Sequence, residues 1–301
     1  MNRFLQAGAS VALLQCFILF ANAREAGRPA IIGLSHVCFQ AADLKKARTF
    51  FHELLGYDEP FKLSKDVSGF ETACFKINDR QYLEIHEGLK QGQEDAIAHL
   101  AFETPEAEGM RRFLAAKGGI AVPDKVSMDA IGNLCFTVRD FEGRLVEFIQ
   151  YLPDSLLMKS KGQSLPPRRL SERIFHAGMP VISPEEACRF YKDILGFSEL
   201  LRSHQDRAPS WINMKIPEAG AYVEWNLMDK ASDRRKISMR YHFALAVPDV
   251  QATAEVLRER AETIGQSLGG FPNVGINNRW QLGVLDPDGR RHELMEPYTM
   301  R

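Results

Sequence analysis

The sequence predicts an α+β fold built from four similar modules that pair into two halves. Three observations predict it. The chain has 301 residues, which is enough for two domains of ordinary size. A helical pattern near residue 50 recurs 140 residues later, and each half alternates short apolar strands with amphipathic helices. Hydrophobic residues make up 45% and charged residues 26% of the chain, which indicates a folded globular protein.

The first 23 residues have the features of a secretory signal peptide. Arg3 precedes an apolar run from Ala7 to Phe20, and the small residues Ala21-Asn22-Ala23 that follow resemble a cleavage site. Gln15 interrupts the run, whereas a membrane span needs about 20 apolar residues. We therefore expect cleavage after Ala23 and an exported protein, periplasmic or secreted, that has no membrane anchor after processing.

The internal repeat predicts two domains, at residues 30–153 and 173–298. Ala47–Tyr57 matches Ala187–Phe197, and Asp140–Gly143 matches Asp286–Gly289. Residues 154–172 carry paired prolines and paired arginines without apolar periodicity, so we expect a solvated linker there.

Each half is predicted to contain two modules in which a strand, a helix and three short strands follow one another. The first strands are expected near Ile31–Phe39, Ala96–Phe102, Ile174–Val181 and Met239–Val247. The helices are expected at Asp43–Leu55, Pro105–Lys117, Pro184–Leu195 and Asp249–Thr263. Gly56 and Gly196 follow two of these helices, because glycine most easily takes the left-handed conformation after a helix.

One histidine and one glutamate recur in every module. The first strands hold His36, His99, His176 and His242, and the last strands hold Glu84, Glu147, Glu224 and Glu293. Imidazoles and carboxylates together bind divalent ions such as Fe, Mn, Ni or Zn. We therefore predict one divalent metal site in each half, with core histidines as the alternative interpretation.

Residues two positions from these candidates lie on the same face of a strand. The residues that follow the four histidines by two are all small, namely Cys38, Ala101, Gly178 and Ala244, which predicts open space beside the ion or tight packing of the sheet. Tyr82 and Tyr222 precede two of the glutamates, so we assign Tyr82, Tyr222 and Cys38 to the substrate pocket, or the tyrosines to the core. His86 shares the face of Glu84, whereas the remaining histidines, His52, His204 and His292, are expected at the surface.

Charge and cysteine content exclude several other functions. Lys and Arg number 38 and Asp and Glu number 39, so the net charge of −1 offers no basic field for nucleic acid or anionic lipid. Cys74, Cys135 and Cys188, like Cys38, lie in apolar segments without a CxxC motif, and their disulfide state stays open. A small molecule is the expected partner, and the oligomeric state stays open.

These motifs resemble the vicinal oxygen chelate superfamily, which includes glyoxalase I, the bleomycin-resistance proteins and the extradiol ring-cleaving dioxygenases. The resemblance is carried by the helices that end in Leu-Gly and by Asp286–Gly289, and it covers nearly all of the chain after the leader. It implies that two modules pair into a cup-shaped sheet of eight strands, so that the chain forms two cup-shaped domains. It also implies that the recurring histidines and glutamates line the cups and hold the metal.

The resemblance leaves three functions open. A glyoxalase-like lyase or isomerase uses all four ligands, with Glu224 or Glu293 as catalytic base, and we favour this function. An extradiol dioxygenase would hold Fe(II) with His176, His242 and Glu293. Against it, Glu224 stands where that family tends to place a second-sphere histidine, and Gly283 stands in place of a tyrosine. A bleomycin-resistance-like protein would bind a small molecule without catalysis.

Overall fold

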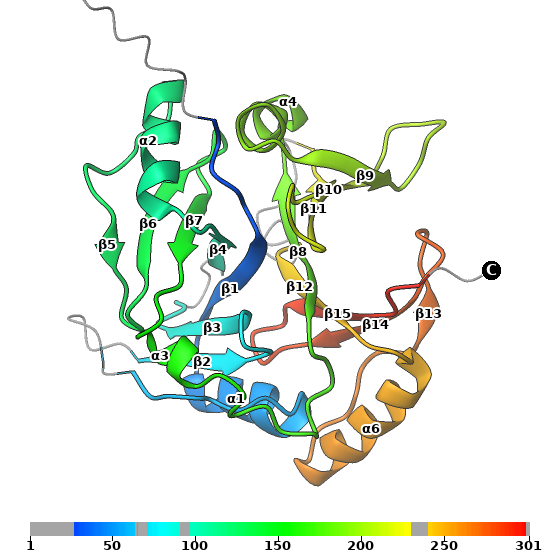
Figure 1. Cartoon of the computed structure of the whole chain (residues 1–301). Coiled ribbons are helices and arrows are strands. Elements are labelled where there is room, and N and C mark those ends of the chain that lie inside the picture. Colours follow the sequence, from blue (N-terminus) through cyan, green and yellow to red (C-terminus); the bar gives the residue numbers. More distant parts are fainter. Residues whose placement is uncertain (1–26, 64, 66–70, 91–96, 230–239, 299–301) are drawn as a thin grey trace, which may run out of the picture.

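A computed structural model describes residues 27–63, 65, 71–90, 97–229 and 240–298. These residues fold into two curled mixed β-sheets with few helices, one sheet in each half of the chain (Figure 1). This arrangement confirms the predicted α+β class with two cup-shaped halves. The predicted signal peptide, residues 1–23, lies outside the described residues. None of the described helices combines the length and the hydropathy that a membrane crossing requires.

The first sheet has seven strands in the order β2-β3-β1-β4-β7-β6-β5. The strands are β1 (Gly33–Ala41), β2 (Thr72–Lys76), β3 (Tyr82–Glu87), β4 (Ile97–Glu103), β5 (Ser127–Met128), β6 (Leu134–Arg139) and β7 (Leu145–Gln150). The central strands β1 and β4 are antiparallel, and each has a parallel neighbour on its other side, β3 and β7 respectively. The first module therefore has two strands after its helix among the described residues, where three were expected.

The second sheet has eight strands in the order β13-β14-β15-β12-β8-β11-β10-β9. The strands are β8 (Ile174–Val181), β9 (Ser198–Arg202), β10 (Trp211–Lys215), β11 (Tyr222–Leu227), β12 (His242–Ala246), β13 (Asn273–Val274), β14 (Trp280–Leu285) and β15 (Arg291–Met295). Its centre repeats the pattern of the first sheet, because β8 and β12 are antiparallel and lie parallel to β11 and β15. The repeated sequence thus produces a repeated strand order.

The helices follow the first strand of each module, and two of them change their winding. They are α1 (Leu44–Arg48) with the π-helical continuation η1 (Thr49–Leu54), α2 (Ala107–Lys117), α4 (Pro184–Ala187) with the π-helical continuation η2 (Cys188–Ile194), and α6 (Val250–Thr263). Asp43, Ser183 and Asp249 cap the starts of α1, α4 and α6 by accepting a backbone N–H with their side chains. The predicted helices are thus present, with π-helical turns that the periodicity did not indicate.

The two halves share one hydrophobic core. Strand alternation turns Phe39 of β1 and Phe243 of β12 to the same interior, where their rings lie 6.0 Å apart. Phe102 of β4 and Phe197 after η2 meet in the same way at 5.4 Å. The histidines alternate with these core residues along the strands, so they point to the opposite, concave faces of the sheets.

The segment between the two sheets is more ordered than its composition indicates. It carries the short helix α3 (Leu156–Lys159), in which Leu157 is fully buried. The buried Lys76 ammonium donates to the carbonyl oxygens of Ser160 and Gln163. The Tyr57 hydroxyl donates to the Ser171 carbonyl. The predicted solvated linker is therefore attached to the first half by buried polar contacts.

Candidate metal centres

The four central strands of each sheet bring two histidines and two glutamates together. In the first sheet, the neighbouring strands β3, β1, β4 and β7 carry Glu84, His36, His99 and Glu147. In the second sheet, β11, β8, β12 and β15 carry Glu224, His176, His242 and Glu293 in the same arrangement. The four side chains of each set thus come from four adjacent strands and lie on the same concave face of the sheet.

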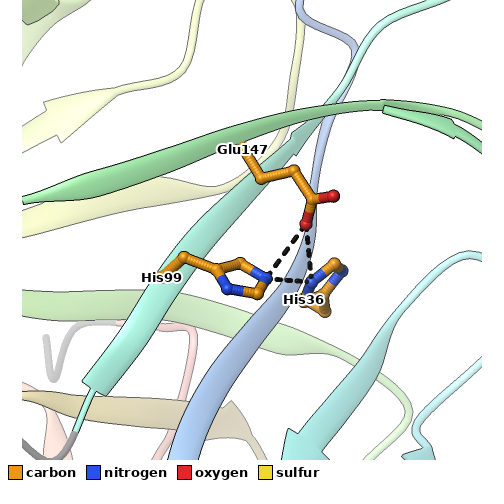
Figure 2. A group of neighbouring side chains, drawn as sticks. All are labelled: His36, His99 and Glu147. Atoms are coloured by element: carbon orange, nitrogen blue, oxygen red, sulfur yellow. Dashed lines mark hydrogen bonds and ion pairs between the residues drawn. The ribbon is translucent and has the colours of Figure 1, made fainter. Parts of the chain in front are cut away.

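In the first centre the four side chains converge on one point. His36 Nε2 lies 2.8 Å from His99 Nε2, 3.2 Å from Glu84 Oε2 and 3.3 Å from Glu147 Oε2. His99 Nε2 lies 3.0 Å from Glu147 Oε2 and 3.7 Å from Glu84 Oε2. Figure 2 shows both imidazoles and the Glu147 carboxylate pointing at one another from three strands.

The second centre has the same composition and a slightly wider geometry. His176 Nε2 lies 3.1 Å from His242 Nε2 and 3.7 Å from Glu293 Oε2. His242 Nε2 lies 3.8 Å from Glu224 Oε1 and 3.9 Å from Glu293 Oε2. All eight predicted ligands are therefore brought together in two groups of four, as the repeat implied.

The small residues beside the histidines make room for the imidazole rings. Ala101 lies opposite His36 in the β1–β4 pair, and Gly178 lies opposite His242 in the β8–β12 pair. A Cβ atom on Gly178 would come within 2.0 Å of His242 Cε1. At Gly178 the small residue therefore serves tight packing of the sheet, the alternative to open space, because the His242 ring fills that space.

The two tyrosines assigned to the substrate pocket stack on histidines. Tyr82 is paired with His36 in the parallel β1–β3 ladder, and the two ring centroids lie 4.4 Å apart. Tyr222 stacks on His176 at 4.7 Å. Both tyrosines are nearly fully buried, so each supports the face of one imidazole.

Hydrogen bonds to the outer nitrogens also orient two of the rings. Ser35 Oγ lies 3.0 Å from His36 Nδ1 and 2.5 Å from the Tyr151 hydroxyl. His242 Nδ1 lies 3.0 Å from the Arg240 carbonyl oxygen, which fixes Nδ1 as the donor and leaves Nε2 with a free electron pair. No sequence pattern indicates Ser35 or Tyr151, since the serine directly precedes His36 and the tyrosine comes from the end of β7.

Electrostatics differ between the two centres. Burial lowers the pKa of His36, but Glu147 and Glu84 outweigh it and raise this pKa to about 9. The pKa values of both carboxyls fall well below their usual range, because their contacts with the histidines outweigh the effect of burial. The metal-free first centre is therefore an ion pair between a charged imidazole and two carboxylates.

The second centre instead keeps its histidines neutral. Burial, together with the neighbouring His242 ring, lowers the pKa of His176 to about 3, and burial lowers the pKa of His242. Burial and the Glu293 charge raise the pKa of Glu224. Burial also acts to raise the pKa of Glu293, but His242 and Arg291 outweigh burial and lower this pKa.

Both donor sets fit a borderline divalent ion. Bonds of about 2.0–2.2 Å to one ion place neighbouring donor atoms about 3.0–3.5 Å apart, and the observed separations bracket that range. Two carboxylates balance the charge of a divalent ion, and the neutral imidazoles of the second centre are in the state that binds metals. The structure thus supports two metal sites by geometry, and the identity of the ion stays a prediction.

The remaining predicted residues lie as follows. His86 Nε2 lies 3.1 Å from Glu84 Oε1, so it contacts the first centre from its open side. Cys38 is fully buried on β1, directly across from Glu84 and His99. All four cysteines among the described residues are free thiols.

The expected surface position of His292 is wrong. His292 is fully buried on the face opposite Glu293, where its ring stacks on Phe243 at 4.0 Å and Nε2 lies 3.2 Å from Asp286 Oδ2. It belongs to the core that joins the halves. His52 and His204 are partly exposed and lie outside both centres.

Comparisons with known proteins concern the family of the second half and the fold of the whole chain. Residues 173–294 match the model of the Glyoxalase/Bleomycin resistance protein/Dioxygenase superfamily. No curated protein sequence matches the chain. The fold is similar to homoprotocatechuate 2,3-dioxygenase from Brevibacterium fuscum in complex with 3,4-dihydroxyphenylacetate, with a TM-score of 0.66, 17% identity, and coverage of 90% of this chain and 82% of that chain.

Two further solved structures show the same likeness. Homoprotocatechuate 2,3-dioxygenase from Arthrobacter globiformis matches with a TM-score of 0.66 at 18% identity, over 89% of this chain and 80% of that chain. The 2,3-dioxygenase LapB from Pseudomonas sp. KL28 matches with a TM-score of 0.61 at 14% identity, over 89% of this chain and 96% of that chain. The family model thus matches the second half of the chain, and the likeness to the solved structures shows that the chain has their tandem two-domain fold.

Proposed function

We propose that the protein is a divalent-metal-dependent enzyme that moves a proton on a small oxygenated substrate, as glyoxalase-type lyases and isomerases do. One observation carries this proposal. Glu224 and Glu293 both lie beside His176 and His242 in the second centre, so the site offers two carboxylates. A two-histidine, one-carboxylate site would not need the second carboxylate.

Glu224 is the better base of the two carboxylates. Arg291 pairs with Glu293 and holds it in place, whereas Glu224 accepts a 3.3 Å hydrogen bond from the Asn226 amide. In the metal-free centre the pKa of Glu224 is raised and that of Glu293 is lowered, so Glu224 is the stronger proton acceptor of the two. Glu224 would take the proton, and His176, His242 and Glu293 would hold the ion.

A divalent ion held there would polarise a substrate oxygen and stabilise the negative charge that develops as the proton leaves. The chain itself supplies orientation and exclusion of water. Tyr222 and the Arg240 carbonyl fix the two imidazoles, and the side chains of all four ligands are at most 11% exposed. A buried site of this kind strengthens every charge interaction within it.

Glu224→Gln tests the proposal. Activity on α-hydroxycarbonyl compounds should fall by about 10²–10⁴-fold, because that is the usual contribution of a positioned acid–base group. Elemental analysis should show the second-centre ion still bound. Glu84→Gln, at the matching position of the first half, is the control, and it reports whether that half contributes to turnover. Full activity of Glu224→Gln would refute the assignment.

An extradiol dioxygenase is the second candidate, because the fold matches those enzymes over about nine tenths of the chain. It predicts oxygen uptake with catechols that requires Fe(II), depends on His176, His242 and Glu293, and survives Glu224→Gln. Gly283 disfavours it, because glycine stands where this family tends to place a tyrosine, and a Cβ atom there would lie 2.5 Å from Arg291 Nε.

Two further expectations belong to this proposal. We propose that the chain is exported and begins at Arg24 after cleavage, and an intact mass of the exported protein that includes residues 1–23 would contradict it. A bleomycin-resistance-like binding function would show as inactivity in both assays together with tight, metal-independent binding of an apolar ligand.

A further inference from the structure

One difference between the two metal centres lies beside the Glu84 carboxylate of the first. The repeat aligns Cys38 with Gly178, and it aligns His86 with Asn226. The glutamate between them is the same in both halves, Glu84 in the first and Glu224 in the second. The first half therefore carries a thiol and an imidazole that the second half lacks.

These extra groups lie around the Glu84 carboxylate. One ligand atom each from Cys38, Glu84 and His86 fall within 4.8 Å of one another. Cys38 and Glu84 are directly opposite in the β1–β3 ladder, and His86 follows Glu84 by two residues on the same face. Thiol, carboxylate and imidazole thus meet on one concave surface.

Glu84 faces two groups of donors with its two oxygens. Oε2 lies 3.2 Å from His36 Nε2 in the first centre. Oε1 lies 3.1 Å from His86 Nε2 on the other side. A carboxylate placed in this way can bridge two ions, which lie about 3.5–4 Å apart in two-metal sites.

We propose that Cys38, Glu84 and His86 form an additional metal position in the first half, next to the His36, His99 and Glu147 ligands, with Glu84 bridging the two. Its thiolate and imidazole donors select borderline ions such as Zn²⁺ or Co²⁺. This position lies in the first half and does not rest on the reaction proposed for the second.

The second half shows that the fold itself does not require these ligands. A small residue is needed opposite the histidine of the adjacent strand, and Gly178 meets that need without sulfur. The glutamate also receives a hydrogen bond without a histidine, because Asn226 Nδ2 donates to Glu224. The thiol and the imidazole therefore add donor capacity beyond what packing demands.

Exposure provides an entry path and open coordination positions. Cys38 is fully buried at the base, the Glu84 side chain is 17% exposed and the His86 side chain is 37% exposed. The side chains thus lead from the sheet to solvent. Three protein ligands leave at least one position for water or another small ligand.

Cobalt loading of the full chain tests the proposal. Thiolate ligation of Co²⁺ gives a sulfur-to-metal charge-transfer band, so wild type should show this band and bind about three ions per chain. Cys38→Ala should remove the band and one ion. His86→Asn, which copies the residue of the second half, should also remove one ion and is exposed enough to fold normally. Cys188→Ala, on η2, is the control and should keep the band.

Any other result would contradict the additional metal position. No band in wild type, or a band that survives Cys38→Ala or is lost in Cys74→Ala instead, would show that Cys38 is not a ligand. A band that is lost in Cys38→Ala with an unchanged ion count would show that Cys38 serves the first ion and that no additional position exists. His242→Ala removes only the second-half ion and should keep the band, so a failure here is separable from a failure of the proposed reaction.

Discussion

At the residue scale, each histidine of the two candidate metal centres depends on a small residue on the neighbouring strand. Antiparallel pairing places Ala244 opposite His176 and Gly178 opposite His242. Strand neighbours on one face lie about 4.5–5.5 Å apart, so a large side chain at either place would displace the ring. The small residues two positions after each histidine in the sequence therefore indicate where the imidazole rings of the neighbouring strand lie.

Gly178→Ala should disrupt the second centre. The new Cβ would lie 2.0 Å from His242 Cε1, so the ring must move, and we expect a loss of about 1–3 kcal/mol of stability and of the second-half ion. Gly220→Ala is the control, because its Cβ would meet open space. Urea unfolding and elemental analysis check both, and unchanged metal content in Gly178→Ala would contradict the geometry.

His36 should make the stability of the metal-free protein depend on pH. Its pKa is about 9 in the folded chain against about 6.5 in the unfolded chain, so it contributes stability below pH 6.5 that is lost as pH rises toward 9. The contribution is up to about 3 kcal/mol. Urea unfolding with a chelator present should show this loss in wild type and not in His36→Asn. Equal slopes for the two proteins would refute the raised pKa.

At the element scale, π-helical turns recur at the same place in both halves. η1 and η2 each follow a short α-helix and end before a glycine with positive φ, Gly56 at 86° and Gly196 at 76°. The surroundings differ, since a Cβ on Gly56 would lie 2.4 Å from the Arg168 carbonyl oxygen, whereas Gly196 has only the Arg28 side chain at 3.4 Å.

Gly56→Ala should therefore cost more stability than Gly196→Ala. Both substitutions carry the left-handed strain of about 1–2 kcal/mol. Only Gly56→Ala also pushes the backbone of the connecting segment away, so its unfolding midpoint in urea should be clearly the lower of the two. Equal midpoints would mean that the segment at Arg168 yields without cost.

At the scale of the whole molecule, an arginine in each half donates a hydrogen bond to the end of the first strand of the other half. Arg290 pairs with Asp286 at 2.6 Å and donates to the Gln40 carbonyl at the end of β1. In the matching turn of the first half, Arg144 donates to the Pro180 carbonyl at the end of β8. The turns that the sequence marked as fold signatures thus connect the two halves.

Arg290→Leu should destabilise the whole chain by about 3–5 kcal/mol, because it leaves a buried carboxylate at Asp286 without its arginine. Arg258→Leu on α6 is the control, since it removes an exposed pair with Glu255 and should cost less than about 1 kcal/mol.

One shared core also predicts that both halves unfold in a single transition. Two separate calorimetric transitions would contradict the shared core.

The sequence by itself determined the modules and the positions that the metal centres use. Strand alternation and helix periodicity are local patterns, so the repeat revealed which His and Glu recur on one face. The strand order then brings those residues together. The positions at Gly56 and Gly196 could likewise be read from the sequence, since left-handed glycines after helices are a local requirement.

Only the tertiary structure decided how the repeated parts meet. His292 lies in the core because its ring stacks on Phe243 of β12, far away in the sequence, and contacts Asp286 in the turn before β15; no local pattern indicates the Phe243 contact. Burial and neighbouring charges also depend on distant residues, which is why His36 and His176, at matching positions, have pKa values shifted in opposite directions. Long-range contacts of this kind are properties of the packed molecule, and a single sequence does not specify them by pattern alone.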